Sequence, residues 1–519
     1  MKQRSWTETA LHLAPGFAFV AHLAVALTHG GPVAVPDVPA YLSIAQRLWG
    51  AVPVAELPYH PGYGFLVGPL GFLDGDALHT AALCVNAFLA GFVVWMVQRL
   101  VRQSTAPRWV LWASTAIACL HPSISHASRV AWPETLLTVL LLAIALCITN
   151  SHQQRWGIAG VLAGLAPLIH PRAVVLAGSL LVLGWLARRS RQTLIGVASG
   201  LLITAIGLQM TDTWQAARLT AAQDIGSEPG PVATVAGQLL AFSTSTACLG
   251  LIGIFAGIAT VVRRRTNVYD DDRLAFFALS AVATLVLGGW VLAGSDRSDT
   301  LLYGRYMDPW AVPVAVSVLC LIAKRSVSRK MLALAAATVV VSFGLVRLET
   351  SEVTQPARGV MTASLRALWV VADENMEVTL VIAVLMSLIS IAGLRRHVGI
   401  AVVCLVLVAA TSTVLTHTHL RDVGQVARGQ MTVASLVSHE TSCLGHDGSS
   451  VKPYAIWLYR LQLPEVEHRQ IDLGNDNGAC GVYVVADKDS LRGCKDAEFL
   501  GQEPRATWGL WRYPVAGCG

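Results

Sequence analysis

Residues 30–73 read GGPVAVPDVPAYLSIAQRLWGAVPVAELPYHPGYGFLVGPLGFL: a proline-rich lead, an amphipathic segment and an aromatic, glycine-rich turn. The stretch lies between apolar runs near 11–29 and 77–98, and runs of this length can cross about 30 Å of hydrocarbon. Its pattern predicts a helix over about 38–49, with Asp37 at its start. We therefore expect the stretch to form the first loop outside the membrane.

The composition is that of a membrane protein. Of the 519 residues, 54% are hydrophobic and 13% are charged, and the mean hydropathy is +0.56, whereas soluble domains carry about 25% charged residues. The net charge of +6 is scattered between apolar runs rather than gathered in one basic domain. This pattern excludes a soluble enzyme, a disordered scaffold and a nucleic-acid-binding protein. We predict an all-α polytopic membrane protein with about 11–13 transmembrane helices.

Thirteen apolar runs are candidate membrane spans, and an odd number places the two termini on opposite sides. With a cytoplasmic N-terminus, the cytoplasmic loops hold 19 of the 38 Lys and Arg residues, and the opposite loops hold 9. The positive-inside rule thus predicts a cytoplasmic N-terminus and an extracytoplasmic tail, as expected for the plasma membrane. The runs lie near 11–29, 77–98, 107–121, 134–149, 156–169, 173–187, 193–209, 236–262, 274–293, 309–323, 331–346, 377–394 and 398–416.

The chain divides into a transmembrane domain, 1–416, whose first outer loop spans 30–76, and an extracytoplasmic domain, 417–519. Six of the ten cysteines lie in apolar runs. On an oxidising face the other four favour two disulfides, with three possible connectivities. These four are Cys443, Cys480, Cys494 and Cys518.

The tail has the pattern of a small mixed α/β or β-rich domain. Strands are expected at 454–460, 481–486 and 507–513, because these runs are rich in apolar and aromatic residues and turn-rich polar stretches separate them. Its aromatic residues could stack on a sugar or pack in a core, and the sequence leaves both roles open. They are Trp457, Trp508, Trp511 and Tyr513.

The first outer loop resembles that of the GT-C superfamily of membrane glycosyltransferases. That family places an acidic residue after the first span, in a pattern D-x-x-x-Y-x-x-x-A-x-x-L, and then a Y-x-P-G-Y-like turn. The matching residues here are Asp37, Tyr41, Ala45, Leu48, Tyr59, His60, Pro61, Gly62 and Tyr63. The resemblance implies transfer of a sugar from a polyprenyl-phosphate donor to an extracytoplasmic glycan, lipid or protein of the cell envelope.

Three further segments resemble members of the superfamily and lie at the outer ends of the expected spans: 126–137, 163–176 and 303–310. In the second, relatives place Arg directly before Pro, whereas this chain has His170 before Pro171 and Arg172 after it. The resemblance covers roughly residues 1–325. Richness in alanine, valine and arginine is similar to that of actinobacterial proteins.

The implied reaction needs a base and cations together. Breaking a sugar–phosphate bond leaves a polyprenyl phosphate, so cations must offset the charge on the leaving oxygen while a carboxylate accepts the acceptor hydroxyl's proton. We predict Asp37 as that base. Because arginine forks suit phosphate oxygens, the candidates for the donor phosphate are Arg305, Arg129, Arg172, His60 and His170. The residues expected to bind substrate are Tyr41, Tyr59, Tyr63, Glu134, Tyr303 and Tyr306.

Structural roles are the alternatives for these ionisable residues. Asp37 could cap the helix that it begins. Arg129 could instead neutralise Glu134, and Arg305 could neutralise Asp308.

The sequence contains no P-loop and no strand-anchored dinucleotide motif, which argues against a nucleotide cofactor. The sequence is compatible with the use of a divalent cation, but it identifies no metal ligand. Lipid-linked arabinose and mannose share one leaving group, so the sugar and the acceptor are not identified.

The alternative function is a transporter or flippase of lipid-linked sugars, which is expected to have inverted repeats and ionisable residues near mid-membrane. Here the charges gather at the outer ends of the spans, which favours an enzyme of cell-wall biogenesis.

Overall fold

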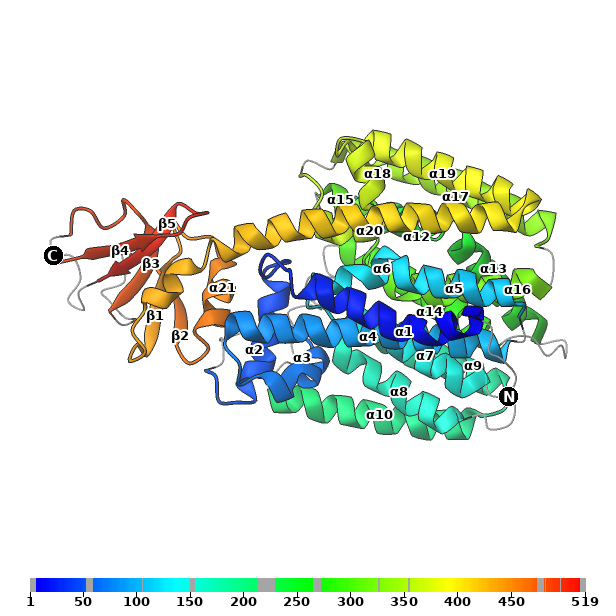
Figure 1. Ribbon diagram of the computed structural model, residues 1–519, viewed down its shortest axis with the longest axis horizontal. Helices are drawn as coiled ribbons and strands as arrows, with labels where there is room; N and C mark the ends of the chain where they lie inside the picture. The colour runs from blue at the N-terminus through cyan, green and yellow to red at the C-terminus, as the bar shows by residue number, and fades with distance from the viewer. Residues whose placement is uncertain are drawn as a thin grey trace.

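Apolar helices lie side by side in a long bundle, and a small sheet domain stands at one end of it (Figure 1). The computed structural model describes residues 6–52, 59–104, 106–149, 155–211, 229–264, 272–295, 297–324, 327–352, 355–473, 480, 482–494 and 496–513. The predicted all-α membrane architecture with a small strand-containing C-terminal domain is confirmed.

The helices begin and end as follows: α1 (Trp6–Ala26), α2 (Asp37–Arg47), α3 (Gly62–Val67), α4 (Gly75–Gln103), α5 (Arg108–Leu120), α6 (Pro122–Ser125), α7 (Glu134–Thr149), α8 (Trp156–Ile169), α9 (Val174–Leu186), α10 (Ser190–Thr211), α12 (Pro231–Ser245), α13 (Leu249–Arg264), α14 (Asp272–Leu292), α15 (Ser298–Leu301), α16 (Asp308–Lys324), α17 (Arg329–Leu348), α18 (Arg366–Val371), α19 (Met376–Arg396), α20 (Val398–Arg428) and α21 (Ala455–Gln462). The strands are β1 (Cys443–Asp447), β2 (Glu467–Ile471), β3 (Tyr483–Asp487), β4 (Glu498–Gln502) and β5 (Trp508–Arg512).

All thirteen expected runs overlap helices, and one of the runs is sharply bent. The run 236–262 consists of α12 and α13, which meet at an angle of 111°. Ala247 and Cys248 make this turn with positive φ angles of 48° and 61°. Within the described residues, seven helices are long and apolar enough to cross a membrane, or up to eight if the bent pair forms one span. The count of thirteen therefore stays a prediction.

Close helix packing in the bundle depends on small residues. Helices α8 and α10 carry Gly160 and Gly164, and Gly196 and Gly200, at a spacing of four residues. A Cβ atom on any of these glycines would collide with the backbone of the other helix. Within a bilayer, such close approach is the main source of helix association, because lipid tails are as apolar as leucine side chains.

Helices α1 and α20 relate the bundle to the sheet domain. Helix α1 begins far from the sheet domain, and α20 runs the length of the bundle and leads into that domain (Figure 1). Helix α20 continues to Arg428, through the expected boundary at 416, and the first strand begins only at Cys443. The first outer loop, which contains α2 and α3, lies between the bundle and the sheet domain.

The C-terminal domain is a five-stranded sheet in the order β2-β1-β3-β5-β4. Strand β1 is parallel to β2 and β3, whereas β5 is antiparallel to β3 and β4. The strands expected at 481–486 and 507–513 are confirmed as β3 and β5. The strand expected at 454–460 is wrong, because the segment lies in helix α21. Its residues Ala455, Leu458 and Tyr459 are buried at helical spacing, so one helix face packs into the core.

The tail aromatic residues belong mainly to the core. Trp508, Trp511 and Tyr513 are 3%, 4% and 4% exposed, and Trp457 is partly buried against the first outer loop. Core packing therefore accounts for the three most buried side chains, and no open stacking platform is formed by them.

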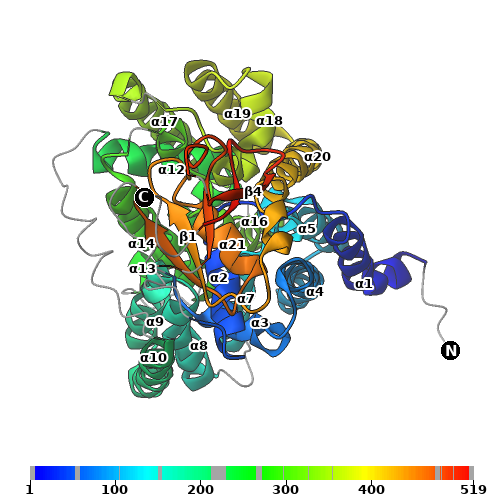
Figure 2. The ribbon, with the colours of Figure 1, turned by 90° about the vertical axis from the view of Figure 1, so that its left-hand side faces the viewer.

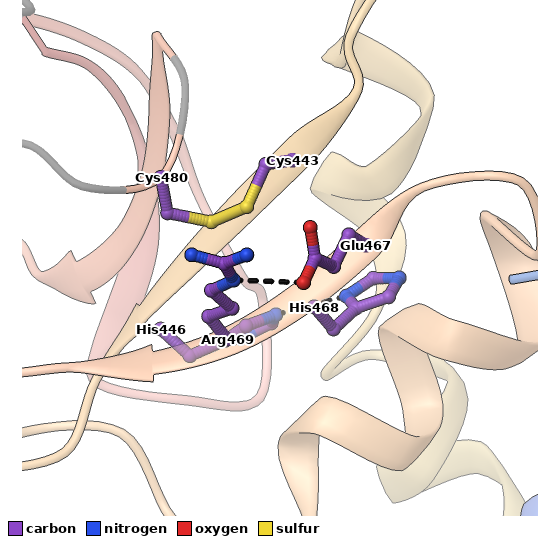
Figure 3. The surroundings of a disulfide bond; sticks show 6 residues. All are labelled: Cys443, His446, Glu467, His468, Arg469 and Cys480. Carbon is purple, nitrogen blue, oxygen red and sulfur yellow. Dashed lines mark hydrogen bonds and ion pairs between the residues drawn. A yellow bond between two sulfur atoms is a disulfide. The ribbon is translucent and has the colours of Figure 1, made fainter. Parts of the chain in front are cut away.

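One predicted disulfide is confirmed: Cys443 of β1 is bonded to Cys480, ahead of β3 (Figure 3). Cys494 is also disulfide-bonded. Cys518 lies outside the described residues, so its pairing stays a prediction.

Buried His446 and partly buried His468 lie beside this disulfide (Figure 3). His446 Nε2 and His468 Nδ1 are 3.0 Å apart, and His468 Nε2 lies 3.2 Å from the carbonyl oxygen of Leu463. Because the carbonyl can only accept, His468 Nε2 carries the proton and His446 Nε2 donates to His468 Nδ1. This chain of hydrogen bonds requires the His468 ring to be neutral, because that ring accepts at one nitrogen and donates at the other.

We expect the C-terminal domain to lose stability in mild acid. Burial lowers the pKa of His468 to about 4 and that of His446 well below its usual value. The unfolded state then binds more protons than the folded state, so stability falls as the pH drops from about 6.5 towards 4. Hydrogen exchange of the β1 and β3 amides in the whole protein, corrected for intrinsic rates, should show more frequent opening at pH 5 than at pH 7.

His468→Gln is the matched variant for this measurement. A glutamine amide can replace both hydrogen bonds but does not titrate, so the dependence on pH should weaken. Equal opening at pH 5 and pH 7 in the wild-type protein would contradict the prediction.

Candidate active site

Asp37 is the first residue of α2, a helix that is buried along most of its length. Its carboxylate accepts two side-chain hydrogen bonds: from Tyr59 Oη to Oδ1 at 2.8 Å, and from Arg305 Nη1 to Oδ2 at 2.8 Å. Within the described part of the chain, no backbone amide of α2 donates to it. The carboxylate is therefore held by side chains and is not used to cap the helix.

Arg305 bridges two carboxylates. Its Nε donates to Glu134 Oε1 at 2.6 Å while its Nη1 contacts Asp37. The side chains of Arg305, Glu134 and Asp37 are 7%, 5% and 18% exposed, so water screens these contacts weakly. The guanidinium also lies over the ring of Trp132, with Cζ 3.6 Å from the ring centroid.

The alternative pairings considered for the arginines are wrong. Arg305 pairs with Asp37 and Glu134, whereas Asp308 accepts a hydrogen bond from the Ser364 hydroxyl. Arg129 donates to the backbone carbonyl and the hydroxyl of Thr28, at the end of α1, and not to Glu134.

Three segments far apart in the sequence meet here. Asp37 begins α2 in the first outer loop, Glu134 begins α7, and Arg305 lies in the turn between α15 and α16. A helix N-terminus favours a carboxylate, which suits the placement of Glu134. Only the packing of these segments brings the two acids to one guanidinium.

A second arginine lies at the same site. A cavity is lined by Glu134, His170, Arg172, Arg305 and Tyr306, together with Leu137 of α7, Thr284 of α14, and Pro309 and Trp310 of α16. Arg172 Nη2 donates to His170 Nε2 at 2.6 Å, and its Cζ lies 2.9 Å from the centroid of the Tyr306 ring. Among the described residues, Arg172 forms no ion pair with a carboxylate. It therefore lines the cavity without being ion-paired, although Glu134 is near enough to interact with its charge.

The other predicted cations are engaged elsewhere. His60 Nδ1 lies 2.6 Å from the carbonyl oxygen of Pro167, so it donates to the end of α8. Arg129, on Thr28, does not line the cavity. His170 lines the cavity beside Arg172, and this is the pair whose order differs from the family pattern.

The predicted tyrosines fall into two groups. Tyr63 is fully buried and its hydroxyl donates to Asn86 Oδ1 at 3.1 Å, while Tyr41 is 2% exposed and packs on Tyr59 with ring centroids 5.1 Å apart. Tyr303 and Tyr306 have their ring centroids 4.5 Å apart, and only Tyr306 lines the cavity. Tyr59 thus contacts the Asp37 carboxylate and Tyr306 the Arg172 guanidinium, whereas Tyr41 of α2 and Tyr63 of α3 are buried in the core between these helices and their neighbours.

Comparisons with known proteins find a family model and solved structures that are similar to this chain. A family model described as Glycosyltransferase family 87 matches residues 57–293. The structure of ArnT from Cupriavidus metallidurans in the apo state is similar, with a TM-score of 0.57 and 16% sequence identity over 98% of each chain. The chain thus shares the fold of ArnT over almost its whole length.

A second structure of ArnT from Cupriavidus metallidurans, bound to undecaprenyl phosphate, is also similar to this chain. Its TM-score is 0.55 and its sequence identity is 16%, over 97% of this chain and 98% of that chain. No curated protein sequence matches this chain.

Two residues of the site were not predicted from the sequence. Trp132 stacks on Arg305 and lies two residues before Glu134. It falls within the family-like segment 126–137, so this motif could have indicated it. Met361 receives contacts from Tyr303 Oη at 3.3 Å and Arg305 Nη1 at 3.6 Å, and no sequence motif marks it.

In the part of the chain that the structure describes, no group of three or more His, Cys, Asp and Glu side chains could hold a metal ion. The carboxylates of Asp37 and Glu134 share Arg305 as their counter-ion.

Proposed function

We propose that this protein is a GT-C membrane glycosyltransferase, which moves a sugar from a polyprenyl-phosphate donor to a hydroxyl of a cell-envelope acceptor with Asp37 as general base. The observation that carries the proposal is the Asp37 carboxylate, oriented by Tyr59 and Arg305, near a cavity lined by Arg172 and His170. The similarity to a protein whose structure holds undecaprenyl phosphate supports a polyprenyl-phosphate donor.

The proposed step transfers one proton and exchanges one bond. The acceptor hydroxyl oxygen forms a bond to the anomeric carbon while the bond from that carbon to the phosphate oxygen breaks. Asp37 takes the hydroxyl proton, and the polyprenyl phosphate leaves with the bonding electrons. The base and the cation that receives the phosphate must therefore act on opposite sides of the sugar.

Arg172 is better suited to the leaving phosphate than Arg305. Arg305 uses Nε and Nη1 for two carboxylates, so a phosphate would have to compete with Glu134 and Asp37 for the same donors. Arg172 has no acidic partner among the described residues, and the stacked ring of Tyr306 orients its planar guanidinium. We assign Arg305 to orienting Asp37, and Arg172 with His170 to the phosphate.

The proposed site faces away from the cytoplasm. The excess of Lys and Arg in the loops on the N-terminal side supports a cytoplasmic N-terminus. The first outer loop and the disulfide-containing domain lie at the other end of the bundle (Figure 1). A disulfide is typical of an oxidising compartment.

Arg172→Gln should raise the KM for the donor by about 10- to 100-fold, because hydrogen bonds to a charged group contribute about 1.5–3 kcal/mol. The matched control is Arg129→Gln, which removes a buried arginine outside the cavity and should leave the donor KM unchanged. Steady-state kinetics of transfer from a purified polyprenyl-phosphate sugar measure the donor KM of both variants. Equal effects of the two substitutions would contradict the assignment of Arg172.

The donor and the acceptor can be identified together. Deleting the gene and measuring lipid-linked sugars and envelope glycans by mass spectrometry should show one donor accumulating and one glycan linkage missing. A purified protein that moves lipid-linked sugars across vesicles without transferring the sugar would instead indicate a flippase.

A further inference from the structure

The C-terminal domain contacts the loop that carries the proposed base. Helix α21 packs against α2, and in Figure 2 it lies directly over α2. Gln46 of α2 is 1% exposed, and its Nε2 donates to the carbonyl oxygen of Leu461 at 3.1 Å. Leu461 is also 1% exposed and belongs to the apolar cluster that includes Tyr41 and Tyr59.

Arg460 joins the two parts more directly. It is 1% exposed, and its guanidinium donates to the carbonyl oxygens of Leu463 and Pro464 in its own domain and of Val52 in the first outer loop. The amide of Val52 donates back to the carbonyl oxygen of Pro464 at 3.1 Å. Within the described residues no carboxylate pairs with Arg460, and its guanidinium donates to backbone carbonyls of two distant segments.

The buried position of Arg460 costs free energy of folding, and what the arginine contributes is a fixed position of Val52 relative to the domain. A buried charge loses its hydration, and here only neutral carbonyls offset that loss. Burial lowers the pKa of Arg460 to about 10, so the side chain still carries its charge at neutral pH. An apolar side chain would fill the same core position, but it could not hold Val52 to the domain.

We propose that Arg460 is a positioning residue through which the C-terminal domain holds the first outer loop in place for the reaction at Asp37. Val52 precedes Tyr59 by seven residues, and Tyr59 donates to the Asp37 carboxylate. Gln46 is held on the same helix that begins at Asp37. The domain thus holds α2 at Gln46 and the first outer loop at Val52. The inference rests on the proposed function of Asp37.

Arg460→Gln and Arg460→Lys test the inference in the full-length protein. Gln should lower kcat by about 10- to 100-fold, the effect of a misplacement of about 1 Å, with little change in the donor KM. Lys keeps the charge but not the planar fork, so it should recover part of kcat. Arg469→Gln is the matched control, because Arg469 is a half-exposed arginine of the same domain, paired with Glu467 (Figure 3).

Hydrogen exchange separates positioning from simple loss of folding. In Arg460→Gln, the amides of α2 and residues 51–52 should exchange faster while those of β3 and β5 stay protected. If Arg460→Gln does not fold, Gln46→Leu removes the other link without changing the domain, and it should also lower kcat. An unchanged kcat in the folded variants, or equal loss of protection in the loop and the strands, would overturn the inference.

Failure of the proposed function gives a different result. If wild-type protein transfers no sugar from any polyprenyl-phosphate donor, the function is wrong. Faster exchange confined to the first outer loop would still show that Arg460 holds it, and unchanged exchange there would show that it does not.

Discussion

Asp37→Asn should reduce transfer by about 100- to 10,000-fold, the usual contribution of a general base, while the protein folds normally. Asparagine has the size of aspartate but cannot accept a proton at neutral pH. Its amide can turn so that the oxygen accepts from Arg305 and the nitrogen donates to the hydroxyl oxygen of Tyr59. The pair of Arg305 with Glu134 remains intact. Single-turnover transfer and thermal unfolding of the purified variant measure the two effects.

Asp74→Asn is the matched control. Asp74 lies in the same loop and caps α4 by accepting from the Ala77 amide at 2.9 Å, a role that asparagine fills about as well. The Asp74→Asn protein should transfer sugar at the wild-type rate. Near-normal turnover of a folded Asp37→Asn protein would remove Asp37 as the base and move that role to Glu134.

Arg305→Met should cost both stability and activity. Removing one partner of a buried ion pair typically costs about 3–5 kcal/mol, because the remaining charge is left without compensation. Here two carboxylates, of Asp37 and Glu134, lose one shared cation. With Asp37 no longer oriented, transfer should fall on the order of 100-fold. Chemical unfolding and steady-state transfer in matched detergent measure the two losses.

The double variant Arg305→Met with Glu134→Gln separates these effects. It removes one of the stranded charges, so part of the stability should return while transfer stays low. Arg305→Lys serves a different purpose, because it keeps the charge without the fork. If that variant raises the donor KM at unchanged stability and kcat, Arg305 binds phosphate rather than orienting Asp37.

Local sequence was sufficient for most helices and for the position of the proposed base. Apolar runs predicted helices because hydropathy is a property of each segment alone. The loop motif marked Asp37, and apolar and aromatic runs marked β3 and β5. The bend between α12 and α13 had no such signal, because Ala247 and Cys248 adopt conformations that usually require glycine. Helix α21 was missed because its apolar run is compatible with a strand until its packing partners are known.

The sequence by itself determined that this chain is a membrane protein, that the loop after its first span carries an acid at the start of a helix, and that charged residues gather at the ends of the spans. It could not determine which arginine meets which acid, since Asp37, Glu134 and Arg305 lie on three separate segments. Tertiary packing decided that Arg305 serves both carboxylates, that Arg172 lines the cavity, and that Arg460 reaches Val52. The physical reason is that an ionic or hydrogen-bonded contact depends on distances of about 3 Å between side chains, and only the folded backbone sets those distances.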